Sequence, residues 1–220
     1  MCGRFSFVIE DALIRERFGV RVQTAIYKAR YNCAPTQNLA VIANETPEQL
    51  QFLHWGLIPY WAKDSAIGNK LINARGETVA EKPSFRNAFK NRRCLVPATG
   101  FFEWRADRVK TPFNIRLKNG EPFAFAGLWD KWLSGDGEAI HSFTIITTIP
   151  NELMTPIHNR MPVILHREDE GRWINSKFDS VLQGLLKPYP AELMEAYPVS
   201  TLVNSPQNEM PAILEPSRLF

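Results

Sequence analysis

The chain has 220 residues, of which 45% are hydrophobic, and its formal net charge at pH 7 is only +3. This composition is typical of a globular protein with a buried core. No segment reaches the roughly 18 consecutive apolar residues of a membrane span, and the first residues lack the layout of a signal peptide, so we expect neither a membrane protein nor a secreted one.

The first predicted element is a helix over 10–18, because Leu13, Ile14 and Phe18 recur at helical spacing and Gly19 follows as a stop signal. Further helices are predicted over 77–92 and 168–186. Strands are predicted for runs rich in β-branched and aromatic residues, which lie at 39–43, 50–56, 94–104, 113–117, 123–129, 142–148 and 161–165.

Many strands with few helices predict an α+β fold, with a curved, barrel-like and mostly antiparallel sheet and a few flanking helices. The chain contains no internal repeat, no low-complexity segment and no long linker. We therefore expect a single domain over 1–220.

The cysteines are few and far apart, at Cys2, Cys33 and Cys94. An odd, widely spaced set predicts a protein of a reducing compartment without disulfides. We therefore expect a cytoplasmic protein, associated with the nucleoid if the source is a bacterium and nuclear if it is a eukaryote. Cys33 and Cys94 are predicted to lie in the core. The four histidines are scattered and no C-x-x-C pair exists, so we expect no metal and no cofactor.

Charge is unevenly distributed along the chain. Between Lys63 and Lys118, thirteen Lys and Arg stand against five Asp and Glu, a balance of +8, whereas the rest of the chain has thirteen against eighteen. A solvated basic face is one interpretation, since Lys and Arg stems often cover apolar surface. A phosphate-binding surface is the other, because such a patch attracts polyanions whatever the net charge.

Three polar positions stand out from their surroundings. Glu103 lies between two aromatic residues in an extended run, where it either faces solvent or faces a cleft in which desolvation raises its pKa. His158 lies in a Pro-bounded turn and is either structural or a proton donor and acceptor. Asn73 and Arg75, before a predicted helix, are either a cap and a surface charge or part of a site.

The N-terminus reads MCGRF. If Met1 is removed, which a small second side chain permits, Cys2 carries a free α-amine beside its thiol. The ordinary pKa values of these groups are about 8 and about 8.5, so both reach nucleophilic forms at cellular pH. Cys2 is thus either an accidental terminal residue or a reactive 1,2-aminothiol.

Six motifs occur in order along the chain: MCGRF, RYNCAPTQ, HWGLIPYWAK, LINARGET, RRCLVPATGFFEW and IHNRMPVIL. Together they resemble the SOS-response-associated peptidase (SRAP) family over essentially the full length. The combination is specific, although no single motif identifies the family. Gly76 and Asn159 stand where alanine and aspartate are frequent in relatives, and neither change touches the proposed reactive groups.

The resemblance implies an SRAP-like fold and a DNA-damage protein that binds single-stranded DNA and couples covalently to abasic sites. It implies that Cys2 is the crosslinking residue and that Asn73, Glu103 and His158 complete the catalytic site. The implied DNA-binding residues are Arg4, Pro35, Trp61, Arg75, Arg86, Trp104 and Arg160. Of these Arg86 is the weakest, because the stretch around it, EKPSFRNAF, is looser than the other motifs.

The chemistry of an abasic site explains why Cys2 suits this role. The ring-opened aldehyde reacts with an amine to give an imine, and the thiol of Cys2 then closes a five-membered thiazolidine. His158 is the expected donor to the sugar ring oxygen and Glu103 the expected proton relay. Because phosphate contacts position a strand without reading bases, we expect little sequence preference. We also expect a monomer.

Two other functions remain open at this stage. One is a peptidase or amidohydrolase that uses the N-terminal cysteine as nucleophile, with its own Met1–Cys2 bond as the first substrate. The other is a non-covalent binder of modified bases or single strands, for which Cys2 is dispensable. The basic block favours a DNA-binding function over a peptidase.

Overall fold

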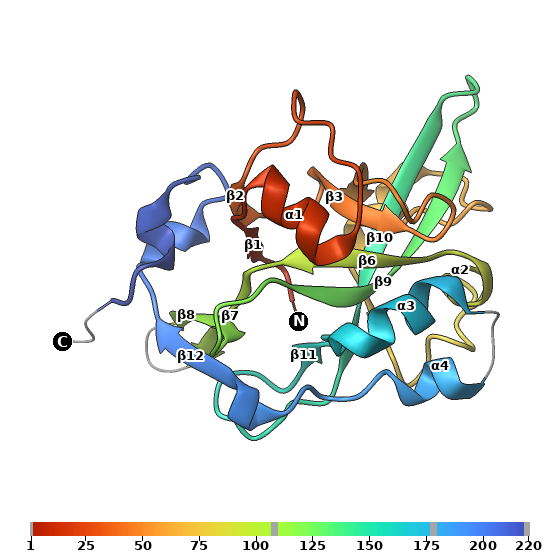
Figure 1. Cartoon of the computed structure of the whole chain (residues 1–220). Coiled ribbons are helices and arrows are strands. Elements are labelled where there is room, and N and C mark those ends of the chain that lie inside the picture. The colour runs from red at the N-terminus through yellow and green to blue at the C-terminus, as the bar shows by residue number, and fades with distance from the viewer. Residues whose placement is uncertain (1, 107–109, 177–179, 218–220) are drawn as a thin grey trace.

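The computed structural model describes residues 2–106, 110–176 and 180–217 (Figure 1). Its strands are β1 (Phe5–Phe7), β2 (Arg30–Cys33), β3 (Asn38–Ala43), β4 (Gln51–Trp55), β5 (Asn73–Arg75), β6 (Arg93–Ala98), β7 (Gly100–Ala106), β8 (Lys110–Leu117), β9 (Phe123–Leu133), β10 (Ala139–Thr148), β11 (Met161–Pro162) and β12 (Met194–Pro198). Its α-helices are α1 (Asp11–Phe18), α2 (Arg86–Asn91), α3 (Arg167–Asn175) and α4 (Ser180–Gly184). Short 3-10 helices are η1 (Ser65–Lys70), η2 (Ala191–Leu193), η3 (Thr201–Asn204) and η4 (Pro211–Leu214).

Five strands close a barrel in the order β10-β4-β3-β6-β9, because β9 also pairs with β10. β5 and β11 add to β10 outside this ring. Among the described strands, β10 runs parallel to β4 and to β5, and the other pairings of this sheet are antiparallel. The prediction of an α+β fold with a barrel-like, mostly antiparallel sheet is confirmed.

A second sheet has the order β12-β8-β7-β1-β2 and lies beside the barrel (Figure 1). The predicted strand over 94–104 divides between the two sheets, because the chain turns at Thr99, whose N–H donates to the Ser6 carbonyl at 2.8 Å. The next residue, Gly100, leaves little room for a side chain, since a Cβ there would lie 2.7 Å from Asn114 Oδ1 and 3.2 Å from the Ile115 carbonyl oxygen. This turn places β1 and β7 side by side and so joins the N-terminus to the Glu103 strand.

The first helix is as predicted, and Gly19 ends it in the left-handed conformation with φ 67°. The other two helix predictions are too long. Within 77–92 only α2 is helical and turns precede it, because Pro83 has no N–H and disfavours a helical residue before it. Within 168–186, α3 ends at Asn175 where Ser176 is extended, and 177–179 lie outside the described residues.

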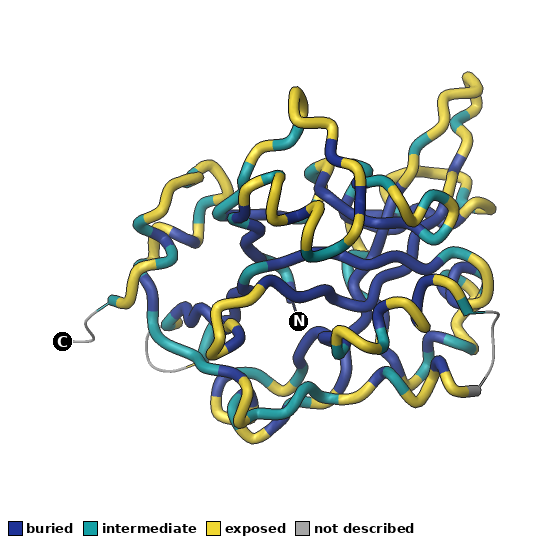
Figure 2. Tube along the Cα trace, viewed as in Figure 1, coloured by how far each residue is buried: buried dark blue, intermediate teal, exposed yellow. Residues whose placement is uncertain are grey.

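The barrel interior is apolar and aromatic. Trp55, Phe125 and Phe143 are each buried there, and Phe5 of β1 packs against Trp55 with ring centroids 5.2 Å apart. Figure 2 shows this burial running through both sheets, while the tip of the β9–β10 hairpin is exposed. Cys33 and Cys94 are buried in the same cluster, as predicted.

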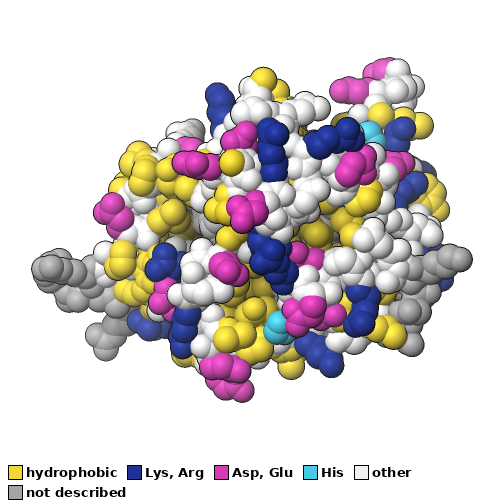
Figure 3. Space-filling view, viewed as in Figure 1, with side chains coloured by type: hydrophobic (Ala, Val, Ile, Leu, Met, Phe, Trp, Pro, Cys, Tyr) yellow, Lys and Arg dark blue, Asp and Glu magenta, His cyan; other side chains and the backbone are white. Residues whose placement is uncertain are grey.

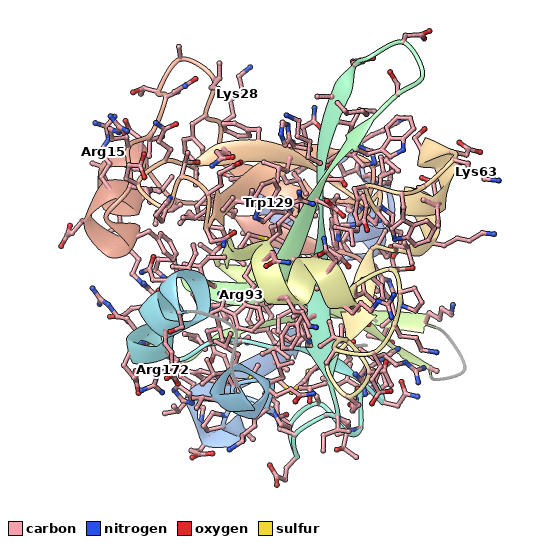
Figure 4. The ribbon with its side chains drawn as sticks, turned by 90° about the vertical axis from the view of Figure 1, so that its right-hand side faces the viewer. Arg15, Lys28, Lys63, Arg93, Trp129 and Arg172 are labelled. Carbon is pink, nitrogen blue, oxygen red and sulfur yellow. The ribbon has the colours of Figure 1, made fainter. Side chains whose placement is uncertain are left out.

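The helices cover the outside of the barrel. Figure 4 looks onto the side that α2 crosses, with Arg93 and Trp129 labelled beside it. The face in Figure 3 mixes basic and acidic side chains and presents no field of one sign. None of the helices in the described part of the chain is long and apolar enough to cross a bilayer.

Candidate active site

The site lies where the barrel and the second sheet meet, and Cys2 and Asn73 define it. Cys2 precedes β1 and is fully buried, and Asn73 is the first residue of β5. The Asn73 amide Nδ2 donates to the Cys2 carbonyl at 2.8 Å. The other amide atom, Oδ1, is buried and accepts no hydrogen bond from any described residue. A buried acceptor without a partner costs about 1–3 kcal/mol, so this atom is poised to receive a donor.

Glu103 lies on β7 and is only 3% exposed, so of the two alternatives for this position the solvent-facing carboxylate is wrong. Its neighbouring strands in the sheet are β8 and β1. Burial raises the pKa of the Glu103 carboxyl, and the positive charge of His158 opposes this rise. This electrostatic coupling indicates that Glu103 and His158 lie near each other.

The surroundings of Cys2 favour the neutral form of its thiol, contrary to the expectation from the ordinary thiol pKa. Burial raises the pKa of the Cys2 thiol, and the nearby negative charge of Glu103 raises it further. The sulfur lies 4.0 Å from the Arg4 carbonyl oxygen, toward which the thiol can donate. Cys2, Asn73, Glu103 and His158, which come from distant parts of the sequence, are thus brought together.

His158 is half-buried in the turn before β11, and its ring orientation is fixed by the backbone. Its Nδ1 lies 3.1 Å from the Arg160 backbone nitrogen and 3.2 Å from the Arg160 carbonyl oxygen. In either neutral tautomer Nδ1 can bond to the Arg160 backbone, as acceptor from the N–H or as donor to the carbonyl. The backbone N–H of His158 donates to the Met154 carbonyl at 2.8 Å. The turn thus presents a ring whose Nε2 can donate a proton.

The guanidinium groups of Arg4 and Arg160 each form hydrogen bonds within the protein through some of their nitrogen atoms. Arg4 Nη1 donates to Asn32 Oδ1 at 2.8 Å and to the Val203 carbonyl at 2.6 Å. Arg160 forms a two-pronged ion pair with Glu77, at 2.6 and 2.9 Å, and Nη2 also donates to the Thr147 carbonyl. The Nε atoms of both arginines are buried without a hydrogen-bond partner among the described residues.

The remaining predicted DNA-binding residues occupy different settings. Arg75 is exposed at the end of β5, and Pro35 is half-buried in the turn after β2. Trp104 is half-buried, and its Nε1 donates to Asn204 Oδ1 at 2.8 Å. Trp61 and Arg86 line one surface cavity of about 330 Å³, which Tyr60, Pro83 and Asn87 complete.

Sequence reasoning did not assign roles to Asn32, Glu77 or Asn204, although each contacts a predicted site residue. Asn32 lies inside the RYNCAPTQ motif and Glu77 inside the LINARGET motif, so their positions in the sequence could have identified them as site residues. Asn204 carried no such signal. Within the described ranges, no three His, Cys, Asp or Glu side chains gather in a way that could hold a metal ion.

Comparison with known proteins gives a consistent result. Residues 1–206 match the family described as "SOS response associated peptidase (SRAP)". The abasic site processing protein YoqW of Bacillus subtilis is 49% identical, over 98% of this chain and 99% of its own length. The abasic site processing protein HMCES of Xenopus tropicalis is 32% identical, over 84% of this chain and 65% of its own.

Solved structures show the same fold. A crystal structure of a protein from Bacteroides thetaiotaomicron has a TM-score of 0.90 and 33% identity, covering 99% of this chain and 100% of that chain. A protein from Bordetella bronchiseptica has a TM-score of 0.80 and 26% identity, covering 90% and 100%. The likeness of the fold therefore extends over both sheets.

Proposed function

The chain belongs to the SOS response associated peptidase (SRAP) family, and we propose that it processes abasic sites in DNA. The relatives YoqW and HMCES are both named abasic site processing proteins. In this proposal, Cys2 becomes the N-terminal residue and forms a thiazolidine crosslink with the ring-opened aldehyde of an abasic site in single-stranded DNA. The crosslink caps and shields the lesion. The observation that carries the proposal is the convergence of Asn73, Glu103 and His158 on Cys2.

The first chemical step opens the sugar ring and joins it to the protein. His158 donates a proton from Nε2 to the ring oxygen while the C1′ hydroxyl loses its proton, so the bond from C1′ to the ring oxygen breaks and C1′ becomes an aldehyde. The Cys2 amine adds to C1′, and the resulting carbinol loses one water to give an imine. Glu103 is suited to carry protons between the amine, the carbinol and the leaving water, because its raised pKa keeps a proton available at a higher pH than an ordinary carboxyl does.

The second step closes the ring. The Cys2 sulfur forms a bond to the imine carbon, and the thiol proton ends on the nitrogen, so no further atom is lost. A neutral thiol is retained until this point, because burial and Glu103 raise its pKa. Asn73 supports both steps, since Nδ2 holds the Cys2 carbonyl and Oδ1 is available for the amine or a sugar hydroxyl.

We propose single-stranded DNA as the partner, bound with little sequence preference by a monomer. Arg4 keeps Nε and Nη2 without a described protein acceptor, and two such N–H groups can take two phosphate oxygens. Arg75, Arg86 and Arg160 are the further proposed phosphate contacts. Pro35, Trp61 and Trp104 are proposed to contact the bases beside the lesion.

Substitution of Cys2 tests this function directly. Cys2→Ala should abolish the covalent adduct with an abasic single strand, seen on a denaturing gel, and should leave binding to an intact single strand within about twofold, because Cys2 makes no phosphate contact. Cys2→Ser should give at most a labile imine, since a hydroxyl closes the ring poorly. A heat-stable adduct formed by Cys2→Ala would mean that another nucleophile is responsible.

A further inference from the structure

The chain after β12 folds back onto the second sheet and builds a small core of its own. Val199, Val203 and Ile213 pack there against Phe102, and Val199 pairs with Pro216 through an isolated bridge. Figure 1 shows this C-terminal segment, coloured blue, at the opposite end of the molecule from the β9–β10 hairpin. We call residues 199–209 the C-terminal strap.

The strap contacts two of the residues proposed to bind DNA. The Val203 carbonyl accepts a hydrogen bond from Arg4 Nη1 at 2.6 Å, and Asn204 Oδ1 accepts one from Trp104 Nε1 at 2.8 Å. The Arg4 guanidinium also lies 6.0 Å from the centre of the Trp104 ring. The strap therefore fixes a cation and an aromatic ring that lie next to each other beside β1.

Asn32 connects the strap to Arg4. It is fully buried on β2, and its Oδ1 accepts from Arg4 Nη1 at 2.8 Å. Its Nδ2 donates at 2.9 Å to the carbonyls of both Ser205 and Asn208. One side chain thus holds the guanidinium with one end and the strap backbone with the other.

Glu209 fastens the end of the strap to the same strand. Oε1 accepts from the Tyr31 N–H and, at 3.0 Å, from the Asn32 N–H, while Oε2 pairs with Arg30 Nε at 2.9 Å. Asn208 and Glu209 lie beyond residue 206, where the match to the family ends. This chain therefore secures the strap with residues outside the matched region.

We propose that Asn32 and Glu209 are positioning residues for DNA binding, which act by fixing the strap and, through it, Arg4 and Trp104. This inference rests on the proposed function. With Arg4 Nη1 bound internally, the guanidinium is oriented before DNA arrives, with Nε and Nη2 left for a phosphate. Preorganisation of this kind lowers the ordering cost of binding, so release of the strap weakens affinity and leaves the chemistry of bound DNA unaffected.

The test measures binding of an intact single strand, with no lesion, to the full chain. Glu209→Ala should weaken binding about tenfold, the size expected when a charged hydrogen-bonding group is lost. Glu209→Gln, which keeps one acceptor oxygen, should recover part of the affinity. Glu195→Ala is the matched control, because Glu195 forms a comparable surface ion pair with Arg116 and has no contact with the strap among the described residues. The rate of crosslinking at saturating abasic DNA should stay within about twofold in every variant.

A double-mutant cycle separates positioning from a general loss of structure. If the strap acts through Arg4, Glu209→Ala should cost much less affinity in an Arg4→Ala background than in the wild type. Equal losses in both backgrounds, or a Glu209→Ala protein that binds like Glu195→Ala, would overturn the inference. Failure of the wild type to form an adduct with abasic DNA would instead contradict the proposed function. The two failures can be told apart, because binding of an intact strand is measured without any adduct.

Discussion

Two regions of the molecule bury polar groups, and they treat those groups differently. On the barrel, Arg93 is 2% exposed and donates to the carbonyls of Trp173, Phe89, Lys90 and Ser176. In the site, the buried Asn73 Oδ1 has no partner among the described residues, and neither have Nε of Arg4 and of Arg160. The hydrogen bonds of Arg93 are made within the protein, whereas these three atoms of the site have no partner among the described residues.

The difference follows from what each region does. Arg93 joins β6 to α2 and α3, so its hydrogen bonds contribute to folding. Asn73 and Arg4 are held by one end only, and their remaining donors and acceptors cost stability until something binds them. Such a cost is typical of a binding or catalytic site. Substitutions in the two regions should therefore separate stability from activity.

The largest effect is expected on the structural side. Arg93→Ala should lower the free energy of unfolding by about 3–5 kcal/mol, because it removes four hydrogen bonds to backbone carbonyls, two of them fully buried. Chemical denaturation measures this loss, and crosslinking per folded molecule should stay near wild type. A variant as stable as the wild type would contradict the role given to Arg93.

Glu103→Gln should show the opposite behaviour. Crosslinking should slow by about 100-fold or more, because the proton relay is lost. Since the folded-state pKa of Glu103 is raised, its ionisation in the wild type costs stability as the pH rises through that pKa. The variant should therefore match the wild type in stability near pH 4 and exceed it at pH 8, by thermal unfolding at both values. Equal stability at both values would mean that the carboxylate is not penalised by burial.

Asn73→Ala should lower the crosslinking rate about tenfold, a loss of the size of one hydrogen bond. It should change the free energy of unfolding by less than about 1 kcal/mol, because the bond from Nδ2 to Cys2 is lost together with the cost of the unpartnered Oδ1. Single-turnover kinetics and denaturation give the two values. A large loss of stability with an unchanged rate would make Asn73 structural.

The smallest effect is expected at Arg75, which is exposed. Arg75→Ala should weaken binding of single strands similarly for all sequences and reduce the salt slope of the affinity by about 1. Titrations at several salt concentrations measure the slope. Arg21→Ala is the control, because Arg21 is an exposed arginine in the segment after α1 and forms an ion pair with Glu48. An unchanged slope would remove Arg75 from the phosphate contacts.

The sequence predicted the barrel because its strands are long, apolar and bounded by turn residues. It did not predict β1, β2, β5 and β12, which have three to five residues and are too short to show a period. Glu103 illustrates the same limit at the site. Alternation along its strand allowed either face, and only the tertiary structure, which pairs β7 with β1 and β8 and places Cys2 and His158 near Glu103, shows that it is buried.

The N-terminal motif predicted the proposed nucleophile, and the other motifs predicted which residues meet it. The partners of the arginines could not be predicted, because they depend on long-range contacts. Arg160 pairs with Glu77 from a segment 83 residues away, and Arg4 bonds to Val203 across 199 residues. Nothing in the local sequence specifies such pairs.

The central claim is that Cys2, as an aminothiol, bonds to the abasic sugar. Intact-protein mass spectrometry tests it, on the purified chain before and after incubation with a single-stranded oligonucleotide that contains one abasic site. We predict loss of Met1, followed by a heat-stable species with the mass of protein plus DNA minus one water. A processed protein that binds the intact lesion and forms no adduct would contradict the claim and favour a peptidase.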